Sequence, residues 1–248
     1  MDIAIFNILM LKSDDSFINV FFNSQCGRIE GRYYHQLDKK APAVLILAPD
    51  PKYGGDFNNN IIKILENVFI ECGFTTLSIN YRGVGKSEGV IRESIDAIYD
   101  SSFAIDWLKS ENKSAICFWV AGYSFGAYVA ANIATRRPEI ENFILLSPII
   151  KNYDFSFAHP ALCNGAIIIG EKDNFTNISD IDSELKKMNE VNYEIVKFIP
   201  IGEADHLYKG KEEELISSLR NYINITVATR IIKPVKKKRR KRTKKEER

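Results

Sequence analysis

The sequence predicts an α/β protein with a mostly parallel central sheet and helices on both of its faces. From residue 43 onward, short apolar runs of β type alternate with amphipathic helical stretches. The apolar runs are nearly continuous, as expected for strands that are buried on both faces of a parallel sheet. With 248 residues, the chain is long enough for one large domain with a well-buried core.

The elements follow from these patterns in chain order. Two strand-like stretches come first, Phe17–Asn23 and Gly27–Tyr34, with a short turn between them. Six apolar runs then predict strands at Ala43–Leu47, Thr75–Asn80, Ala115–Ala121, Asn142–Leu146, Ala166–Ile169 and Tyr193–Ile199. Amphipathic stretches predict helices at Ile61–Glu71, Ile91–Ser110, Ala127–Arg136 and Ile178–Glu190. In such a sheet, active residues gather at the carboxyl ends of the strands.

The pentapeptide Gly122-Tyr123-Ser124-Phe125-Gly126 lies between a predicted strand and a predicted helix. A sharp strand-to-helix turn lifts a serine hydroxyl clear of its neighbours, and the helix N-terminus beyond it supplies N–H groups and positive potential. Glycines on both sides allow the tight backbone path. The five letters alone are a weak signal, but this setting indicates a nucleophile elbow at Ser124.

An acid and a histidine follow the elbow in the order that such a site requires. The run Ala166–Ile169 ends in Gly-Glu-Lys-Asp, which places Asp173 at a strand end, and the run Tyr193–Ile201 ends in a segment that closes with His206. The chain has three histidines. His35 falls in an early segment that predicts an edge strand, and His159 precedes the acid in the chain, so His206 is the expected base.

Two other carboxylates compete with Asp173 for the role of orienting acid. Asp205 adjoins His206 in the sequence, and the side chains of adjacent residues rarely turn toward each other. Glu171 is the second choice after Asp173, because it lies at the same strand end.

With these segments in place, the chain resembles the small, lidless α/β-hydrolases related to dienelactone hydrolases. The likeness covers roughly residues 17 to 225. Besides the serine, acid and histidine segments, it rests on three more motifs, residues 48–55 (APDPKYGG), 80–87 (NYRGVGKS) and 153–156 (YDFS). The resemblance implies the α/β-hydrolase fold without a cap domain, over residues 1–232.

The resemblance also implies an oxyanion hole formed by the backbone N–H groups of Asp50 and Phe125. That group usually has His-Pro after the third strand, whereas this chain has Ala48-Pro49. A backbone donor survives the loss of the histidine. The carboxylate of Asp50 would oppose a developing negative charge unless its side chain points away.

Two further segments have alternative interpretations. The aromatic stretch Tyr153–Phe157 either fills the edge of the core or contacts substrate. The Gly-x-Gly within Arg82–Ser87 lacks the third glycine and the immediate helix of a dinucleotide loop, so we expect a tight turn that shapes the wall of the site.

Charge divides the chain into two unlike parts. Residues 233–248 carry eleven Lys or Arg and two Glu, a net of +9, which leaves −7 for residues 1–232 of a chain whose total is +2. Like charges at this density repel, so we expect 233–248 to be a disordered basic tail. It either attaches electrostatically to nucleic acid or an anionic membrane, or is a solvated terminus with nonspecific contacts.

Cysteine spacing and hydropathy favour a reduced, cytoplasmic protein. The four cysteines are widely spaced without a metal-binding pattern, and Cys72 and Cys117 are expected to be small core residues. The apolar N-terminus lacks the positive region and cleavage site of a signal peptide, and no run approaches the length of a membrane span.

Taken together, the motifs and the resemblance imply hydrolysis of a carboxylic ester or thioester of a small acyl substrate by Ser124, His206 and Asp173, through an acyl-enzyme and with no metal or cofactor. The rival hypothesis is a non-catalytic hydrolase-fold adaptor attached to nucleic acid or membrane by the basic tail. Ala48-Pro49 and Asp50 favour the adaptor. The intact serine, acid and histidine favour the enzyme.

Overall fold

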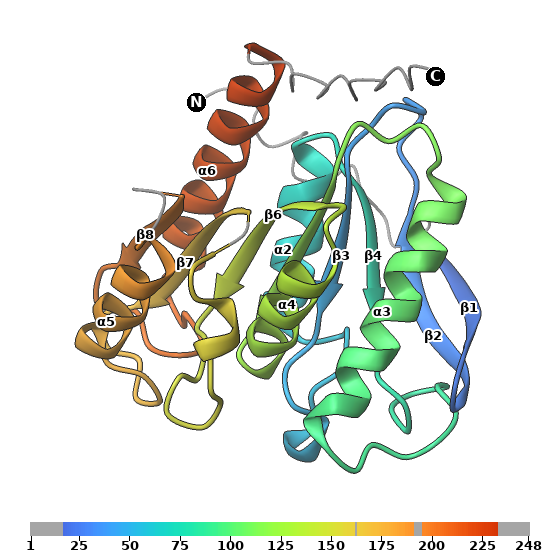
Figure 1. Ribbon diagram of the computed structural model, residues 1–248, viewed down its shortest axis with the longest axis horizontal. Coiled ribbons are helices and arrows are strands. Elements are labelled where there is room, and N and C mark those ends of the chain that lie inside the picture. The colour runs from blue at the N-terminus through green and yellow to red at the C-terminus, as the bar shows by residue number, and fades with distance from the viewer. Residues whose placement is uncertain (1–16, 162, 191–194, 233–248) are drawn as a thin grey trace, which may run out of the picture.

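The computed structural model of the protein describes residues 17–161, 163–190 and 195–232. Its centre is an eight-stranded sheet with the strand order β1-β2-β4-β3-β5-β6-β7-β8 (Figure 1). The strands are β1 Ile18–Ser24, β2 Gly27–Tyr34, β3 Ala43–Leu47, β4 Thr75–Ile79, β5 Phe118–Tyr123, β6 Ile140–Leu146, β7 Asn164–Gly170 and β8 Val196–Ile201. β1, β2 and β4 pair antiparallel, and from β4 to β8 every pairing is parallel. The predicted mostly parallel α/β fold is therefore confirmed.

Helices cover both faces of the sheet. They are α2 Asn60–Glu71, α3 Ser94–Glu111, α4 Phe125–Arg136, α5 Ile178–Met188 and α6 Glu212–Ile232. Helices α3 and α4 pack together on one face, and α2 and α6 contact each other on the other (Figure 1). Because both faces are covered, the central strands lie in the middle of three layers.

The core forms on the central strands, because helices cover them on both faces of the sheet. All five residues of β3 are buried, as are all five of β4. Burying each large aliphatic side chain there stabilises the fold by about 2 kcal/mol relative to leaving it exposed. The carboxyl ends of β5, β7 and β8 lie at the same edge of this buried sheet, which gives the loops that follow them a rigid support.

Several predicted boundaries and positions are wrong, and three of them have a clear physical reason. The strand predicted at Ala115–Ala121 is β5, Phe118–Tyr123, because Ala115 closes a turn onto Asn112 and pairing with β3 begins only at Phe118. The helix predicted from Ile91 begins at Ser94, where Glu93 and Asp96 form a capping box.

The third correction concerns His35, which the sequence analysis places in an edge strand. It follows β2, and β2 lies between β1 and β4, so β1 is the edge strand. Cys117 is buried as predicted, while Cys72 is only half-buried.

Some expectations lie outside the described residues. These are the disordered basic tail at 233–248, the N-terminal part of the predicted domain at 1–16, and the first two residues of the strand predicted from Tyr193. In the part of the chain that the structure describes, no helix combines the length and the apolar character that crossing a bilayer requires.

Candidate active site

Ser124 occupies a strained turn between β5 and α4. Its φ of 58° and ψ of −115° lie outside the regions that a non-glycine residue normally adopts. The Ser124 N–H donates to the carbonyl of Leu146 on the neighbouring strand at 2.8 Å, which ties the turn to β6. The backbone therefore presents the hydroxyl at the carboxyl end of the sheet, as a nucleophile elbow requires.

The two glycines of the pentapeptide are needed for close backbone contacts. A Cβ at Gly122 would overlap the carbonyl of Gly126, and a Cβ at Gly126 would overlap the carbonyl of Leu47 on β3. Any side chain at either position would push the start of α4 away from the sheet. This explains why the motif has glycine on both sides of the serine.

The structure brings Ser124, His206 and Asp173 together from three separate loops. His206 Nε2 lies 3.1 Å from the Ser124 hydroxyl, and His206 Nδ1 lies 2.8 Å from Asp173 Oδ2. The Asp173 side chain is 1% exposed and that of His206 is 11% exposed. The other carboxylate oxygen of Asp173 accepts the N–H of Phe175 at 2.8 Å, which fixes the carboxylate plane.

The competing acids point elsewhere. Asp205 Oδ1 accepts the backbone N–H groups of Leu207 and Lys209, so this carboxylate caps the turn after the histidine. Glu171 accepts the N–H of Glu203 at 3.4 Å. Neither carboxylate hydrogen-bonds to the imidazole.

The competing histidines have partners outside the site. His35 Nδ1 is hydrogen-bonded to the Tyr33 hydroxyl at 2.8 Å, and His159 Nε2 lies 2.6 Å from a carboxylate oxygen of Glu184. Of the three histidines, the structure places only His206 beside Ser124.

Two aromatic rings hold the imidazole. Phe175 packs against it with ring centroids 4.6 Å apart, and Tyr123 packs against it at 5.3 Å. The Tyr123 hydroxyl also donates to the backbone carbonyl of His206 at 3.0 Å. Burial raises the pKa of this hydroxyl well above its usual value, so it remains a donor. The residue before Ser124 thus ties the strand-to-helix turn to the histidine loop, a contact that sequence reasoning missed.

Replacing Tyr123 with phenylalanine should lower kcat roughly tenfold, with little change in KM. The loss of one buried hydrogen bond is worth about 1 kcal/mol, and it would loosen the histidine loop while an aromatic ring stays in the lining of the Ser124 pocket. The Phe ring would keep the contact with the imidazole. Steady-state kinetics on a soluble ester check this, and a change confined to KM would contradict the positioning role.

Two residues that line the pocket of Ser124, Asp50 and Phe125, have backbone N–H groups without a protein acceptor. Phe125 is the first residue of α4, so its N–H has no acceptor within the helix. Among the described residues, no protein acceptor is recorded for the N–H of Phe125 or of Asp50. Both residues line the same pocket as Ser124, which is the arrangement that an oxyanion hole needs.

The carboxylate of Asp50 is held by two donors. Oδ1 accepts the N–H of Lys52 at 2.9 Å and so caps the short 3-10 helix η2, Pro51–Tyr53, and Oδ2 accepts the Tyr153 hydroxyl at 3.3 Å. Burial, together with the charge of Asp50, raises the pKa of Tyr153 to about 12. These two hydrogen bonds stabilise the Asp50 carboxylate. Asp50 nevertheless lines the pocket.

The pocket around Ser124 has a volume of about 780 Å³, within the usual range for small-molecule sites. Tyr53, Phe175 and Leu207 line it and are more than half exposed, so the rim is apolar. Between β6 and β7 the described residues contain only the 3-10 helix η3, Ser156–Ala158, and no cap domain.

The aromatic stretch lies partly in the pocket lining and partly in the core. Tyr153 lines the pocket and stacks on Tyr128 with centroids 4.7 Å apart. Phe155 is buried, and Phe157 packs edge-on against Tyr128. One end of the stretch therefore faces ligand space while the other completes the core.

The Arg82–Ser87 segment forms a tight turn as expected, but none of its residues lines the Ser124 pocket, so the expectation that it shapes the wall of the site is wrong. Arg82 forms a buried ion pair with Asp100 on α3 at 2.8 Å. The neighbouring Tyr81 donates its hydroxyl to the carbonyl of Ala48 at 3.2 Å and packs edge-on against Phe125. The two contacts of Tyr81 connect the loop after β3 with the start of α4. In the described part of the chain, no three His, Cys, Asp or Glu side chains group as a metal site.

An eight-stranded, mostly parallel sheet with a strained serine after β5 and a histidine after β8 defines an α/β hydrolase. A family described as serine aminopeptidase, S33 matches residues 61–178. An uncharacterized protein of Rickettsia prowazekii is 35% identical over 208 residues, which cover 82% of this chain and 87% of that protein.

Two solved structures extend the comparison. A protein of unknown function from Agrobacterium tumefaciens, designated an α/β hydrolase, is 35% identical, with a TM-score of 0.82 over 86% of this chain and 97% of that one. An α/β serine hydrolase without a lid from Xanthomonas campestris is 20% identical, with a TM-score of 0.75 over 89% and 97% of the two chains. The chain belongs to the α/β-hydrolase family and is similar in fold to its lidless serine hydrolases, which confirms the resemblance seen in the sequence.

Proposed function

We propose that this hydrolase cleaves a carboxylic ester or thioester of a small acyl group through an acyl-enzyme on Ser124. The observation that carries the proposal is the continuous hydrogen-bonded series from Asp173 through His206 to Ser124, at 2.8 and 3.1 Å, inside a pocket. A buried carboxylate that accepts from Nδ1–H leaves Nε2 as the base that faces the serine.

In the proposed first step, Ser124 Oγ attacks the substrate carbonyl while His206 Nε2 takes the hydroxyl proton. The carbonyl oxygen becomes an oxyanion, which the N–H groups of Asp50 and Phe125 stabilise. When the tetrahedral intermediate collapses, the imidazolium gives its proton to the departing alcohol or thiol. Water then attacks the acyl-enzyme with His206 again acting as base, and Ser124 is released.

A burst experiment tests the acyl-enzyme. Mixing the protein with excess p-nitrophenyl acetate should release about one equivalent of nitrophenol before the steady state, if deacylation is the slower step. Intact-protein mass spectrometry after an acid quench should show one added acetyl group. Turnover without a trapped adduct, either with p-nitrophenyl acetate or with a pivaloyl ester that deacylates slowly, would contradict the formation of an acyl-enzyme.

The open pocket predicts a preference for short acyl chains. Without a cap domain in the described residues, a long chain would leave most of its apolar surface in water and gain little binding energy for the transition state. Values of kcat/KM for p-nitrophenyl esters should therefore peak between acetyl and hexanoyl. A steady rise to palmitoyl would show that a long acyl chain is bound along its length.

A further inference from the structure

The carboxylate of Asp50 carries a charge that no cationic side chain of the described residues neutralises. Asp50 lines the Ser124 pocket and is partly exposed. Its two hydrogen bonds come from uncharged donors, the backbone N–H of Lys52 at 2.9 Å and the Tyr153 hydroxyl at 3.3 Å. Lys52 is exposed, and its side chain forms no ion pair with Asp50 in the described part of the chain. The pocket wall therefore holds a negative charge without a counter-ion.

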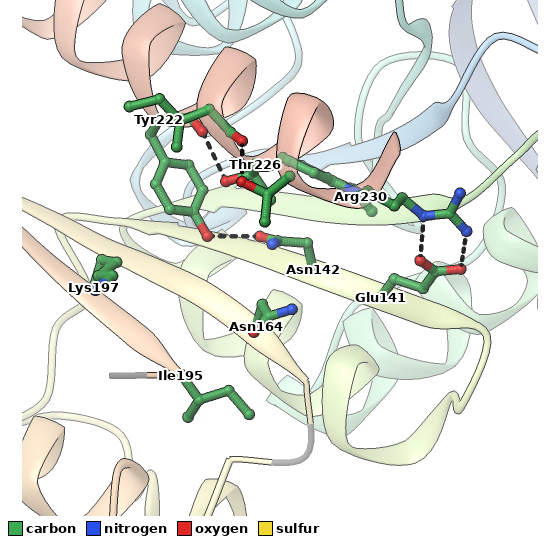
Figure 2. A pocket seen from close by; sticks show the side chains of 11 residues that line it. Glu141, Asn142, Asn164, Ile195, Lys197, Tyr222, Thr226 and Arg230 are labelled. Atoms are coloured by element: carbon green, nitrogen blue, oxygen red, sulfur yellow. Dashed lines mark hydrogen bonds and ion pairs between the residues drawn. The ribbon is translucent and has the colours of Figure 1, made fainter. Parts of the chain in front are cut away.

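An ion pair lines another pocket, under α6 (Figure 2). Its members are Arg230 and Glu141, whose side chains pair at 2.7 Å. In the same pocket, the Asn142 side chain accepts the Tyr222 hydroxyl at 2.9 Å. Because the ion pair neutralises both of its members, it gives no reason to expect a charged ligand. Asp50 differs, since its uncharged partners leave its full charge in place.

The position of Asp50 brings this charge close to the reacting carbonyl. In the proposed reaction, the backbone N–H of Asp50 stabilises the oxyanion, and the carboxylate of the same residue is only a side-chain length away. For an uncharged acyl group, the carboxylate and the oxyanion repel each other and the barrier rises. A cation on the α- or β-carbon of the acyl group would be attracted by the carboxylate and would offset this repulsion.

The surroundings of the carboxylate indicate which kind of cation fits. Tyr153 and Phe125 both line the pocket, with ring centroids 5.4 Å apart, and Tyr53 lines it at 90% exposure. The faces of such rings attract cations. Both oxygens of Asp50 already accept a hydrogen bond, so the residue supplies charge more readily than free acceptor sites. A primary ammonium needs acceptors for three N–H groups, whereas a quaternary ammonium has none and needs only charge and ring faces.

We propose, on the basis of the ester hydrolysis proposed above, that Asp50 selects an acyl group with a quaternary ammonium on its α- or β-carbon. The ammonium lies against the Asp50 carboxylate and the ring of Tyr153, on the acyl side of the scissile bond. The leaving group lies on the other side, at His206 Nε2, which gives it a proton. Asp50 is therefore a specificity residue, and Ser124 and His206 react as described for an uncharged ester.

Two esters of the same shape test this selection. Betaine (trimethylglycine) benzyl ester carries a quaternary nitrogen, and 3,3-dimethylbutanoic acid benzyl ester has carbon in its place. The measurement is the ratio of kcat/KM for the charged ester to that for the uncharged one, from benzyl alcohol released. Asp50→Asn should lower this ratio at least about tenfold, because it removes the attraction between two nearby charges. The intrinsic reactivities of the two esters cancel when the variant's ratio is divided by the parent's.

The two rates should also move in opposite directions in Asp50→Asn. Hydrolysis of the betaine ester should fall, since the cation loses its partner. Hydrolysis of the uncharged ester should rise, since no carboxylate opposes the oxyanion. The asparagine oxygen can still accept the N–H of Lys52, which keeps the cap of η2.

Asp56→Asn is the matched control. Asp56 lies on the same loop and accepts the N–H of Asn58, two residues further on, at 2.7 Å, as Asp50 does with Lys52. It does not line the Ser124 pocket, so the ratio should stay at the parent's value.

A pair of variants at Tyr153 separates its ring from its hydroxyl. Tyr153→Phe keeps the ring and should keep most of the preference for the betaine ester. Tyr153→Leu removes the ring and should lower the ratio roughly threefold, the size of an exposed cation–π contact. Circular dichroism checks that both variants are folded.

The results also distinguish this inference from the proposed hydrolysis. If p-nitrophenyl acetate is hydrolysed but the ratio in Asp50→Asn stays within about threefold of the parent's, Asp50 does not recognise the cation and the inference alone is overturned. A larger dependence on Asp50 for glycine benzyl ester than for the betaine ester would overturn the assignment to a quaternary ammonium. No turnover of any ester, p-nitrophenyl acetate included, would overturn the proposed function and this inference with it.

Discussion

Replacing Ser124 with alanine is expected to lower the hydrolysis of p-nitrophenyl acetate by roughly 10⁴-fold or more, because the variant has no nucleophile to form the acyl-enzyme. The fold should be unaffected. The elbow is held by the backbone, through the Ser124 N–H bond to Leu146, whereas the hydroxyl is bonded to His206. Alanine can keep the first contact and lose only the second.

Steady-state rates and circular dichroism measure this result, with Ser217→Ala as the matched control. Ser217 is exposed on α6 and bonds only to the carbonyl of Glu214 in the described structure, so its loss should leave the rate unchanged. If Ser124→Ala kept a rate within tenfold of the parent, Ser124 would not be the nucleophile.

Replacing Asp173 with asparagine is expected to have the next largest effect, a loss in kcat of roughly 10⁴-fold, as when the orienting carboxylate of a Ser-His-Asp triad becomes an amide. Asp173 Oδ2 accepts from His206 Nδ1, and an amide nitrogen in that place would favour the wrong imidazole tautomer. Nε2 would then carry the proton and could not take one from Ser124.

Asp205→Asn is the matched control, one residue from the same histidine. Asp205 Oδ1 accepts two backbone N–H groups, and an asparagine oxygen can accept both, so kcat should change little. Kinetics of the two variants on one ester decide the matter. A larger loss in Asp205→Asn than in Asp173→Asn would mean that the acid has been assigned to the wrong carboxylate.

The sequence was enough to predict that the candidate site residues lie close together, because the carboxyl ends of parallel strands lie at the same edge of a sheet. Ser124, Asp173 and His206 each follow an apolar run, so their proximity follows from the predicted sheet without any contact being known. The same reasoning ranked Asp173 above Asp205, and the structure shows the physical reason, since Asp205 is occupied by its own turn.

What could not be predicted depends on contacts between distant parts of the chain. The hydroxyl of Tyr123 meets the carbonyl of His206 across 83 positions, and nothing in the local pattern of either residue signals it. The sequence indicated that the Asp50 carboxylate would lie beside the expected oxyanion hole. It did not indicate the hydrogen bonds from Lys52 and Tyr153, because these form only when the loops fold together.

The burial of Asn142 was equally hard to predict. Asn142 looks like the polar first residue of an apolar run, and its burial follows from the strand register with Trp119 and Asn164 and from the helix that covers them. The start of β5 was misplaced for a related reason. Ala115, Ile116 and Cys117 are apolar enough for a strand, yet the backbone is still completing the turn after α3.

The most direct test of Ser124 as the nucleophile is labelling with a fluorophosphonate probe, followed by peptide mapping by mass spectrometry. A serine activated by His206 should take up one equivalent of the probe, on the peptide that contains Ser124. Labelling should be abolished in Ser124→Ala, with its native circular dichroism retained. Undiminished labelling of Ser124→Ala, an adduct on another residue, or no adduct on the folded parent protein would contradict the assignment.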